Sequence, residues 1–266
     1  PGVLGEFLTP APNQQPMLWR TSPAATELEE VATGWLRELL GLPEPFEGVI
    51  NDSGSSSTFH ALLAAREAAI PGVRLHGLSA RPDVPRLRVY CSELTHSSVD
   101  KALMALGMGH AALRKIPVDD AYRMRPDALE NAIAEDRAAG NLPVAVVATV
   151  GTTSAGSVDP VAAIASLCRT HGVWLHVDAC HAGTAAMLPE HASIFDGVAE
   201  ADSVVGNPHK WMFTPMDASV LFCRRMDTLR AALALTPAYL ETREAGAVHN
   251  LMDTGIALGR RFRALK

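Results

Sequence analysis

The sequence predicts an α/β fold in which a mainly parallel, mixed sheet of seven strands carries helices on both faces. Three features of the 266-residue chain support this fold class. Short apolar runs alternate with segments of helical length from about residue 48 onward, which is typical of βαβ units. Several runs lack polar residues, as strands buried on both faces do. Polar residues follow the runs directly, where open α/β sheets bind ligands.

Composition excludes several classes of protein. The chain is 48% hydrophobic and 20% charged, which suits an ordinary globular domain. Its net charge of −6 has mixed signs and no apolar run reaches membrane-spanning length, so we expect neither a nucleic-acid nor a membrane partner. The histidines and cysteines show no zinc-site spacing, so we expect no metal. The cysteines, which we expect to be reduced thiols in a cytoplasmic protein, are Cys91, Cys168, Cys180 and Cys223.

The first helix is predicted to begin at Ser22-Pro23. Residues 1–21 are rich in Pro and Gln and lack periodicity, so we expect an extended N-terminal segment. Proline is favourable in the first turn of a helix, and Thr26 with Glu29 has the spacing of a capping box.

This helix has an apolar stripe at helical spacing, which we expect to pack into the core. Gly41 then ends the helix. The stripe, in which Trp35 is the largest side chain, consists of Leu28, Val31, Ala32, Trp35, Leu36, Leu39 and Leu40.

The remaining chain alternates between strands and helices. Strands are predicted at residues 48–50, 87–90, 114–116, 144–148, 173–177, 203–205 and 219–223. Helices are predicted at residues 58–69, 98–106, 126–139 and 160–170. We expect residues 51–57 to form a polar loop and residues 71–86 to form a surface loop rather than a domain boundary.

The polar residues that follow the strands form a candidate site, because they gather at the carboxyl edge of the sheet. They supply hydroxyls, an imidazole, a carboxylate and an amine. In chain order they are residues 51–57, Thr95-His96, residues 151–153, Asp178 and residues 207–210.

Residues 53–57 precede a predicted helix and have two interpretations. They form either a flexible loop with an N-cap or an anion site, where unpaired N–H groups and the helix dipole favour a phosphate. The motif of a P-loop is absent.

Lys210 also has two interpretations when it is taken alone. It is either a lysine that extends to water or a desolvated amine that forms a Schiff base. Asp178 either makes a structural hydrogen bond or pairs with the protonated nitrogen of a pyridine ring. Taken alone, a histidine such as His96 more often has a structural role than a catalytic one, and threonines such as Thr152 and Thr153 are more often turn residues.

Together, these residues match one cofactor, pyridoxal phosphate (PLP). PLP needs an amine for its aldehyde, a carboxylate for its pyridinium, a phosphate site and a flat group against its ring. The chain offers all four after predicted strands, with Asp178 and Lys210 on successive strands.

Seven short motifs extend this match along the chain. They are residues 22–29 (SPAATELE), 95–99 (THSSV), 147–153 (VATVGTT), 174–179 (WLHVDA), 201–203 (ADS), 207–211 (NPHKW) and 258–266 (LGRRFRALK). In this order they resemble the group II PLP-dependent decarboxylases, in the branch of aromatic-L-amino-acid and histidine decarboxylases.

The resemblance implies an enzyme, a carboxy-lyase that converts an aromatic L-amino acid to its amine through an external aldimine and a quinonoid. It implies a fold-type I homodimer with the active site at the subunit interface. It also implies a PLP-binding large domain at residues 22–239 and a mobile catalytic loop at 240–254. Residues 255–266 would then lead to a C-terminal small domain that this chain lacks.

The resemblance also implies roles for single residues. Lys210 would hold PLP covalently, Asp178 would pair with the ring nitrogen, and His96 would stack on the ring. The implied catalytic residues are Lys210, His96, Asp178 and His209. The implied cofactor-binding residues are Ser53, Gly54, Ser55, His96, Thr152, Thr153, Asp178, Cys180, Asn207, His209 and Lys210. The candidate substrate-binding residues are Gln15, Met17 and Trp19.

The chain departs from the family pattern near the cofactor. Cys180 replaces an alanine that packs on the ring, and His181 follows where an aromatic residue is frequent. Asp52 replaces a small residue beside the phosphate, which is unfavourable unless its carboxylate points away.

The largest departure is Leu251, which replaces the loop tyrosine that is credited with protonating the carbanion. Leucine cannot donate a proton. The alternatives are therefore an oxygen-dependent aldehyde synthase, or a catalytically inactive PLP-fold protein. His249 is either a substitute acid or an exposed loop residue, whereas His96 is typical of the decarboxylases.

Overall fold

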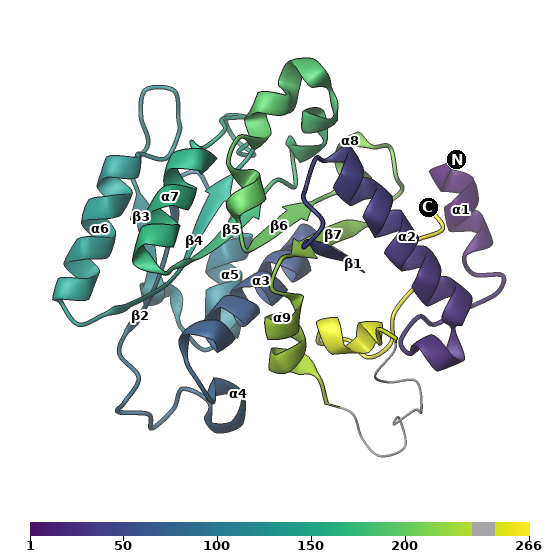
Figure 1. The fold of residues 1–266 in the computed structure, drawn as a ribbon, viewed down its shortest axis with the longest axis horizontal. Helices are drawn as coiled ribbons and strands as arrows, with labels where there is room; N and C mark the ends of the chain where they lie inside the picture. The colour runs from purple at the N-terminus through teal and green to yellow at the C-terminus, as the bar shows by residue number, and fades with distance from the viewer. Residues whose placement is uncertain (236–247) are drawn as a thin grey trace.

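The computed structural model describes residues 1–235 and 248–266, and these build one seven-stranded sheet in the order β1-β7-β6-β5-β4-β2-β3 (Figure 1). Only β7 runs antiparallel to its neighbours, so the predicted mixed, mainly parallel sheet is confirmed. The strands are β1 (Glu47–Asn51), β2 (Leu87–Ser92), β3 (Leu113–Ile116), β4 (Leu142–Thr149), β5 (Trp174–Asp178), β6 (Ser203–Gly206) and β7 (Ser219–Cys223).

Helices cover both faces of this sheet, as predicted (Figure 1). One face packs against α3, α5 and α9, and the other against α6, α7 and the end of α2. None of the described helices is long and apolar enough to cross a membrane. The α-helices are α1 (Gly2–Leu8), α2 (Pro23–Leu39), α3 (Gly54–Ala69), α4 (Val73–His76), α5 (Ser98–Ala105), α6 (Pro126–Ala138), α7 (Val161–His171), α8 (Pro208–Trp211) and α9 (Met226–Leu233).

The central strand β4 shows why both faces are apolar. Successive side chains of a strand point to opposite faces. Ala145 and Val147 therefore join the core beneath α3 and α5, whereas Val146 and Ala148 join the core beneath α6 and α7.

Three local predictions are wrong. The predicted loop at 51–57 ends early, because the Ser53 side chain caps α3 and the helix begins at Gly54. The segment 71–86 contains the single turn α4. Residues 1–21 are not fully extended, since α1 and a 3₁₀ turn at Trp19–Thr21 form.

The position of α1 depends on the other end of the chain. A Cβ at Gly5 would lie 2.2 Å from the carbonyl oxygen of Leu265, so the helix packs directly on the C-terminal backbone. Glu6 forms an ion pair with Lys266 at 2.6 Å. Because these contacts lie some 260 residues apart in sequence, local periodicity could not predict α1.

The predicted burial of the α2 stripe is wrong for part of the stripe, although Leu40 is buried and Leu36 packs against the core. Val31, Trp35 and Leu39 are 45%, 62% and 54% exposed, and the buried face holds Thr26 and Glu29. Alanine, threonine and glutamate side chains face β1, so Val31, Trp35 and Leu39 lie on the outer side of the helix.

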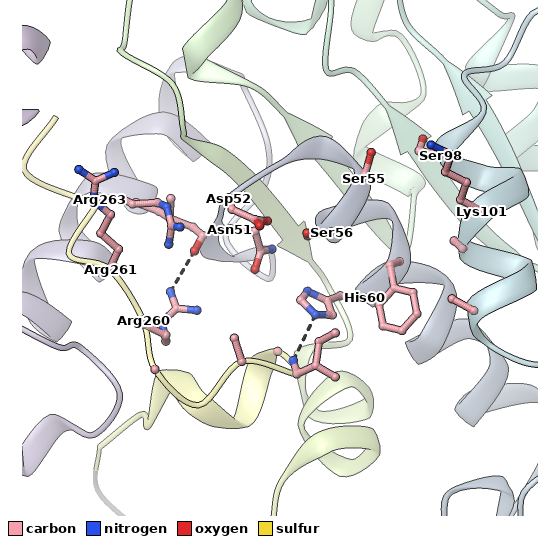
Figure 2. Close-up of a pocket in the computed structure, with 18 residues that line it drawn as sticks. Asn51, Asp52, Ser55, Ser56, His60, Ser98, Lys101, Arg260, Arg261 and Arg263 are labelled. Carbon is pink, nitrogen blue, oxygen red and sulfur yellow. Dashed lines mark hydrogen bonds between the residues drawn. The ribbon is translucent and has the colours of Figure 1, made fainter.

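The capping box predicted at Thr26 and Glu29 is also wrong. Thr26 donates its hydroxyl hydrogen to the carbonyl of Ser22, and Glu29 turns inward. The Glu29 carboxylate accepts from the backbone N–H of Ile50 and pairs with Arg260. Arg260 also donates to the Ile50 carbonyl at 3.0 Å (Figure 2). Glu29 therefore joins α2, β1 and the C-terminal segment.

Candidate active site

The carboxyl ends of three parallel neighbours, β4, β5 and β6, meet at one edge of the sheet. A cavity of about 220 Å³ lies there, beside the N-terminal ends of α3 and α8. The predicted site residues that line it are Ser53, Gly54, Ser55, His96, Thr153, Asp178, Cys180, Asn207, His209 and Lys210. The sheet thus brings together side chains that are up to 157 residues apart in sequence, from Ser53 to Lys210.

Lys210 lies in the one-turn helix α8, directly after β6. Its side chain lines the cavity and is exposed, so the desolvated setting considered for this amine is not present. The preceding residues Asn207 and Pro208 are buried and fix the start of the turn. The amine is therefore accessible from the cavity while its backbone is held by the sheet.

Asp178 is the last residue of β5 and is 6% exposed. Its Oδ1 accepts from the backbone N–H of Cys180 at 3.1 Å, which orients the carboxylate. A buried carboxylate is costly unless it has partners. Among the described residues this is the one hydrogen bond that the carboxylate accepts, so the acid at the cavity wall is suited to pair with a cation.

His96 has a defined tautomer in this arrangement. Its Nδ1 accepts from the backbone N–H of Ser98 at 3.1 Å and lies 3.0 Å from the Ser98 hydroxyl. In the neutral ring the proton is therefore on Nε2. This leaves one N–H and the flat face of an exposed imidazole at the cavity.

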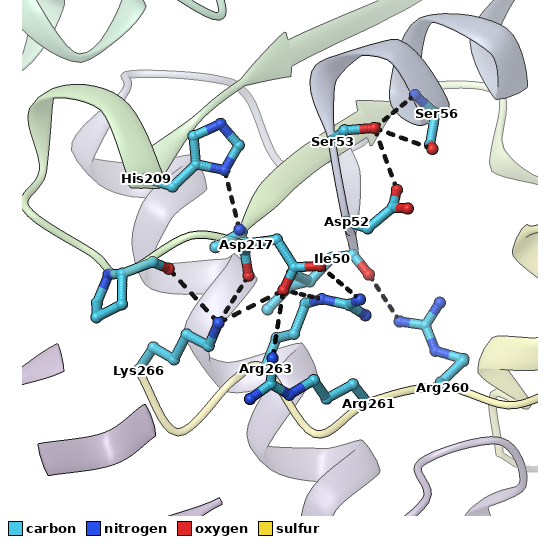
Figure 3. Close-up of polar contacts among 12 residues, drawn as sticks. Ile50, Asp52, Ser53, Ser56, His209, Asp217, Arg260, Arg261, Arg263 and Lys266 are labelled. Carbon is cyan, nitrogen blue, oxygen red and sulfur yellow. Dashed lines mark hydrogen bonds and ion pairs between the residues drawn. The ribbon is translucent and has the colours of Figure 1, made fainter. Parts of the chain in front are cut away.

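His209 is held in a similar way, because its Nδ1 accepts from the backbone N–H of Ala218 at 3.0 Å (Figure 3). Burial lowers the pKa of His209, and the nearby cations Lys210 and Lys266 lower it further. The ring is thus neutral at pH 7, with its proton on Nε2.

The N-terminus of α3 forms the phosphate side of the cavity. The Ser53 hydroxyl oxygen caps the helix by accepting from the N–H of Ser56 at 3.2 Å (Figure 3). A Cβ at Gly54 would lie 2.6 Å from Cys180 Sγ and 3.0 Å from Asn207 Nδ2. The helix end therefore approaches β5 and β6 closely, and only glycine fits there.

These features fit PLP. The cavity presents an accessible amine, a buried carboxylate and a helix N-terminus whose unpaired N–H groups favour a phosphate. Asn207 is 3% exposed, and its buried Oδ1 has no partner among the described residues.

The whole chain, residues 1–266, matches the model of the pyridoxal-dependent decarboxylase conserved domain. The chain belongs to this family. It is 39% identical to phenylacetaldehyde synthase of Arabidopsis thaliana and 38% identical to aromatic-L-amino-acid decarboxylase of Sus scrofa, over all of its own length. It covers 55% and 57% of those proteins, so it spans about half the length of the curated relatives it matches.

Solved decarboxylase structures have the same fold. The crystal structure of Oryza sativa TDC with PLP and tryptamine superposes with a TM-score of 0.93 at 37% identity. It is matched over 99% of this chain and 56% of that chain. Rhodiola rosea 4-hydroxyphenylacetaldehyde synthase gives a TM-score of 0.88 at 31% identity, over 99% and 55% of the two chains. The expected fold-type I class is confirmed.

The position of Thr152 differs from the prediction that it lines the site. Its hydroxyl lies 2.8 Å from that of Ser157 and accepts from the Ser157 N–H, so it holds the turn and does not line the cavity. Its neighbour Thr153 does line it. Gly151 makes the turn possible, because its φ is +85° and a Cβ would lie 2.4 Å from Ala182 Cβ.

Asp52 points away from the cofactor cavity. Its Oδ1 accepts from the Ser53 hydroxyl, and its side chain lines the neighbouring cavity shown in Figure 2. The acid thus does not face the phosphate side of the site.

The three candidate substrate-binding residues do not reach this cavity. Gln15 lines a surface pocket beside Arg260, and Met17 packs against Leu18 and Met252. Trp19 donates its Nε1–H to Glu27 at 2.9 Å. Within one chain, the prediction for these residues is not supported.

The catalytic-loop candidates also lie elsewhere. Residues 236–247 of this region are outside the described residues. Leu251 is 5% exposed in a 3₁₀ turn packed on α9, and His249 lies 3.4 Å from Glu30. Neither side chain lines the cofactor cavity.

Three lining residues were not predicted from the sequence, and these are Ser98, Thr149 and Met216. Thr149 ends β4, and Ser98 begins α5, so their strand-end and helix-start positions were a usable signal. Met216 comes from the irregular segment after α8, where no pattern marks it.

The contact between Gly54 and Cys180 gives a test of the cavity. We expect Gly54→Ala to weaken PLP binding by about tenfold or more, because the new methyl group overpacks the helix end. The double variant Gly54→Ala/Cys180→Ala should recover much of the affinity, since it removes Sγ. A spectroscopic PLP titration measures both.

Gly34→Ala in α2 is the matched control, because a Cβ there meets nothing within 4 Å. If the double variant binds PLP no better than Gly54→Ala alone, Cys180 is not the limiting contact.

Proposed function

We propose that this chain carries the PLP-binding domain of a decarboxylase that converts an aromatic L-amino acid to its amine. The observation that carries this proposal is the convergence of Lys210, Asp178 and His96 on one cavity. The relatives support the substrate class, since they include tyrosine decarboxylase 2 of Arabidopsis thaliana and tryptophan decarboxylase 1 of Oryza sativa subsp. japonica.

Each residue would contribute through its place in the cavity. PLP, when bound, supplies an electron sink for the electron pair that is left at the α-carbon as carbon dioxide departs. The amine of Lys210 would hold the cofactor covalently, and Asp178 would keep a proton on its ring nitrogen. His96 would cover the ring and hold a proton at Nε2, while Ser53, Gly54 and Ser55 would bind the phosphate with help from Asn207 and His209.

We propose a cytoplasmic homodimer without nucleic-acid or membrane partners, in which a second copy completes the site. Gln15, Met17 and Leu251 lie outside the cofactor cavity of their own chain. This placement supports a role for them in the site of the partner copy. Sedimentation of the full-length protein tests the dimer.

An aldehyde synthase is the second candidate function. It is favoured by Leu251, which cannot supply a proton, and by the similarity to phenylacetaldehyde synthase. A product-resolved assay over Trp, Tyr, Dopa, Phe, His and Glu separates the two functions. Amine without peroxide supports the decarboxylase, whereas aldehyde with stoichiometric peroxide and ammonia contradicts it.

We expect Leu251→Tyr to raise amine formation by about tenfold or more, because a phenol at this position restores a general acid. The rate of amine release by the full-length protein measures this effect. Leu258→Tyr, in an exposed part of the same segment, is the matched control. An unchanged rate in Leu251→Tyr would place residue 251 away from the reacting carbon.

A further inference from the structure

Asp217 lies at the centre of a charged cluster, in the segment between α8 and β7 (Figure 3). Arg263 donates two hydrogen bonds to its carboxylate, from Nε to Oδ1 at 3.1 Å and from a terminal nitrogen to Oδ2 at 3.0 Å. Lys266 lies 3.5 Å from the same carboxylate and also pairs with Glu6 of α1 at 2.6 Å. Arg261 lies 3.8 Å from Asp217 Oδ1. We call these five residues the Asp217 cluster, which joins both ends of the chain to one loop.

Lys266 also holds the backbone of this loop, residues 215–218. Its ammonium donates to the carbonyl of Asp217 at 2.9 Å and to that of Pro215 at 3.5 Å (Figure 3). These two carbonyls flank Met216, which lines the cofactor cavity. The Lys266 side chain is only 1% exposed, and a buried ammonium is costly unless it has such acceptors. The cluster therefore keeps the 215–218 loop in one position against the cavity.

The loop in turn holds His209. Ala218 directly follows Asp217, and its backbone N–H donates to His209 Nδ1 at 3.0 Å. The Ala218 carbonyl accepts from the backbone N–H of His209 at 3.4 Å. Ala218 is 5% exposed, so a rotation of the ring would leave its N–H without an acceptor, which is unfavourable. The ring is thus fixed with Nε2–H as its free donor, in a residue that lines the cofactor cavity.

The charge of Asp217 maintains this arrangement at neutral pH. Burial opposes ionisation of its carboxyl, but the hydrogen bonds from Arg263 outweigh burial and lower its pKa. The carboxylate is therefore charged, and its contacts with Arg263 are charge-assisted hydrogen bonds, which are stronger than neutral ones. Neither Asp217, Arg263 nor Lys266 lines the cofactor cavity, so any effect they have on the cofactor passes through the residues that do.

We propose that Asp217, Arg263 and Lys266 are positioning residues for the cofactor site. They fix the 215–218 loop, and the backbone N–H of Ala218 then holds the His209 ring so that Nε2–H donates to the phosphate of PLP. This inference rests on the proposed function, in which His209 helps to bind that phosphate. The C-terminal segment thus raises the affinity for PLP without touching it.

A double-mutant cycle in the full-length protein tests this role. The Kd for PLP is measured by titrating the apoprotein and following absorbance, for the wild type, Asp217→Asn, His209→Ala and the double variant. We expect Asp217→Asn to weaken binding by about tenfold, as for the loss of one charge-assisted hydrogen bond. In the His209→Ala background the same substitution should change the Kd by less than about twofold, because the ring through which it acts is absent.

A second ligand and a second variant serve as controls. Pyridoxal lacks the phosphate, so its affinity should be the same in Asp217→Asn and the wild type. Asp119→Asn is the matched variant, because Asp119 also pairs with an arginine, Arg123, at 2.8 Å but does not line the cavity. It should bind PLP like the wild type.

Variants of Arg263 test the same contact from its other side. Arg263→Met should reproduce the loss of PLP affinity, and Arg263→Lys should recover part of it, because the lysine keeps the charge but not the two parallel hydrogen bonds. These variants also provide the cycle with His209→Ala if Asp217→Asn does not fold.

An equal loss of PLP affinity in the wild-type and His209→Ala backgrounds would overturn the inference, since the cluster would then support the fold and not the ring. A matching loss for pyridoxal would overturn it as well. If the wild type takes up no PLP, the proposed function fails and this inference fails with it. PLP uptake by the wild type with additive losses in the cycle overturns this inference alone.

Discussion

We expect Lys210→Ala to abolish covalent binding of PLP and to lower the decarboxylation rate by more than about 10³-fold. Lys210 is the one lysine that lines the described cofactor cavity, so no other lysine amine there can take its place. Loss of the absorbance band of bound PLP and a single-turnover assay measure the two effects.

Lys115→Ala is the control, because that lysine is also partly exposed but lies on β3, away from the cavity. If the wild type, like Lys210→Ala, shows neither the absorbance band nor activity, the enzyme proposal is contradicted. The chain would then be a catalytically inactive binding or dimerisation module. An intact absorbance band with little activity in the wild type would instead place the defect in a step that follows PLP binding.

The sequence could predict that the side chains of the cofactor site gather around one cavity, because they lie at the ends of strands. Asp178 and Asn207 directly follow apolar runs, and parallel strands carry their carboxyl ends to one edge. Thr152 was misassigned for the same reason, since a strand-end rule cannot tell which of two adjacent residues turns inward. Met216 could not be predicted, because its position depends on how an irregular segment folds back over the edge.

The faces of α2 show a different limit. Periodicity indicates which residues share a face of a helix, but not which face is inside. Here the inner face carries Glu29, which is acceptable only because Arg260, 231 residues later, neutralises it. That compensation is a tertiary contact, and no local pattern reports it. Trp35 was consequently assigned to the core although it is exposed.

The Glu29–Arg260 pair also leads to a large expected effect on stability. We expect Arg260→Met to lower the free energy of unfolding by about 3–5 kcal/mol, because it leaves a buried carboxylate without its counter-charge. The side chains of Arg260 and Glu29 are only 6% and 1% exposed. Urea unfolding of the two proteins measures the difference, with Arg123→Met as control. Its exposed pair with Asp119 should contribute less than about 1 kcal/mol.

The pH dependence identifies the cause of this loss. Burial raises the pKa of Glu29 above its ordinary value of 4.5, and Arg260 opposes that rise. Without Arg260 the pKa rises further, so the folded state favours the protonated acid more strongly than the unfolded state does. The stability of Arg260→Met should therefore be highest in acid and fall as pH rises above about 4.5 towards neutrality.

Adding Glu29→Gln to Arg260→Met separates the two possible causes of the stability loss, which are the unpaired charge of Glu29 and the lost packing of the arginine side chain. The double variant Glu29→Gln/Arg260→Met has no buried charge at this site, so it should be more stable at pH 7 than Arg260→Met alone, and less dependent on pH. If the double variant is as unstable as the single one, packing of the arginine stem dominates. If Arg260→Met unfolds at the same urea concentration as the wild type, the pair does not hold α2 to β1.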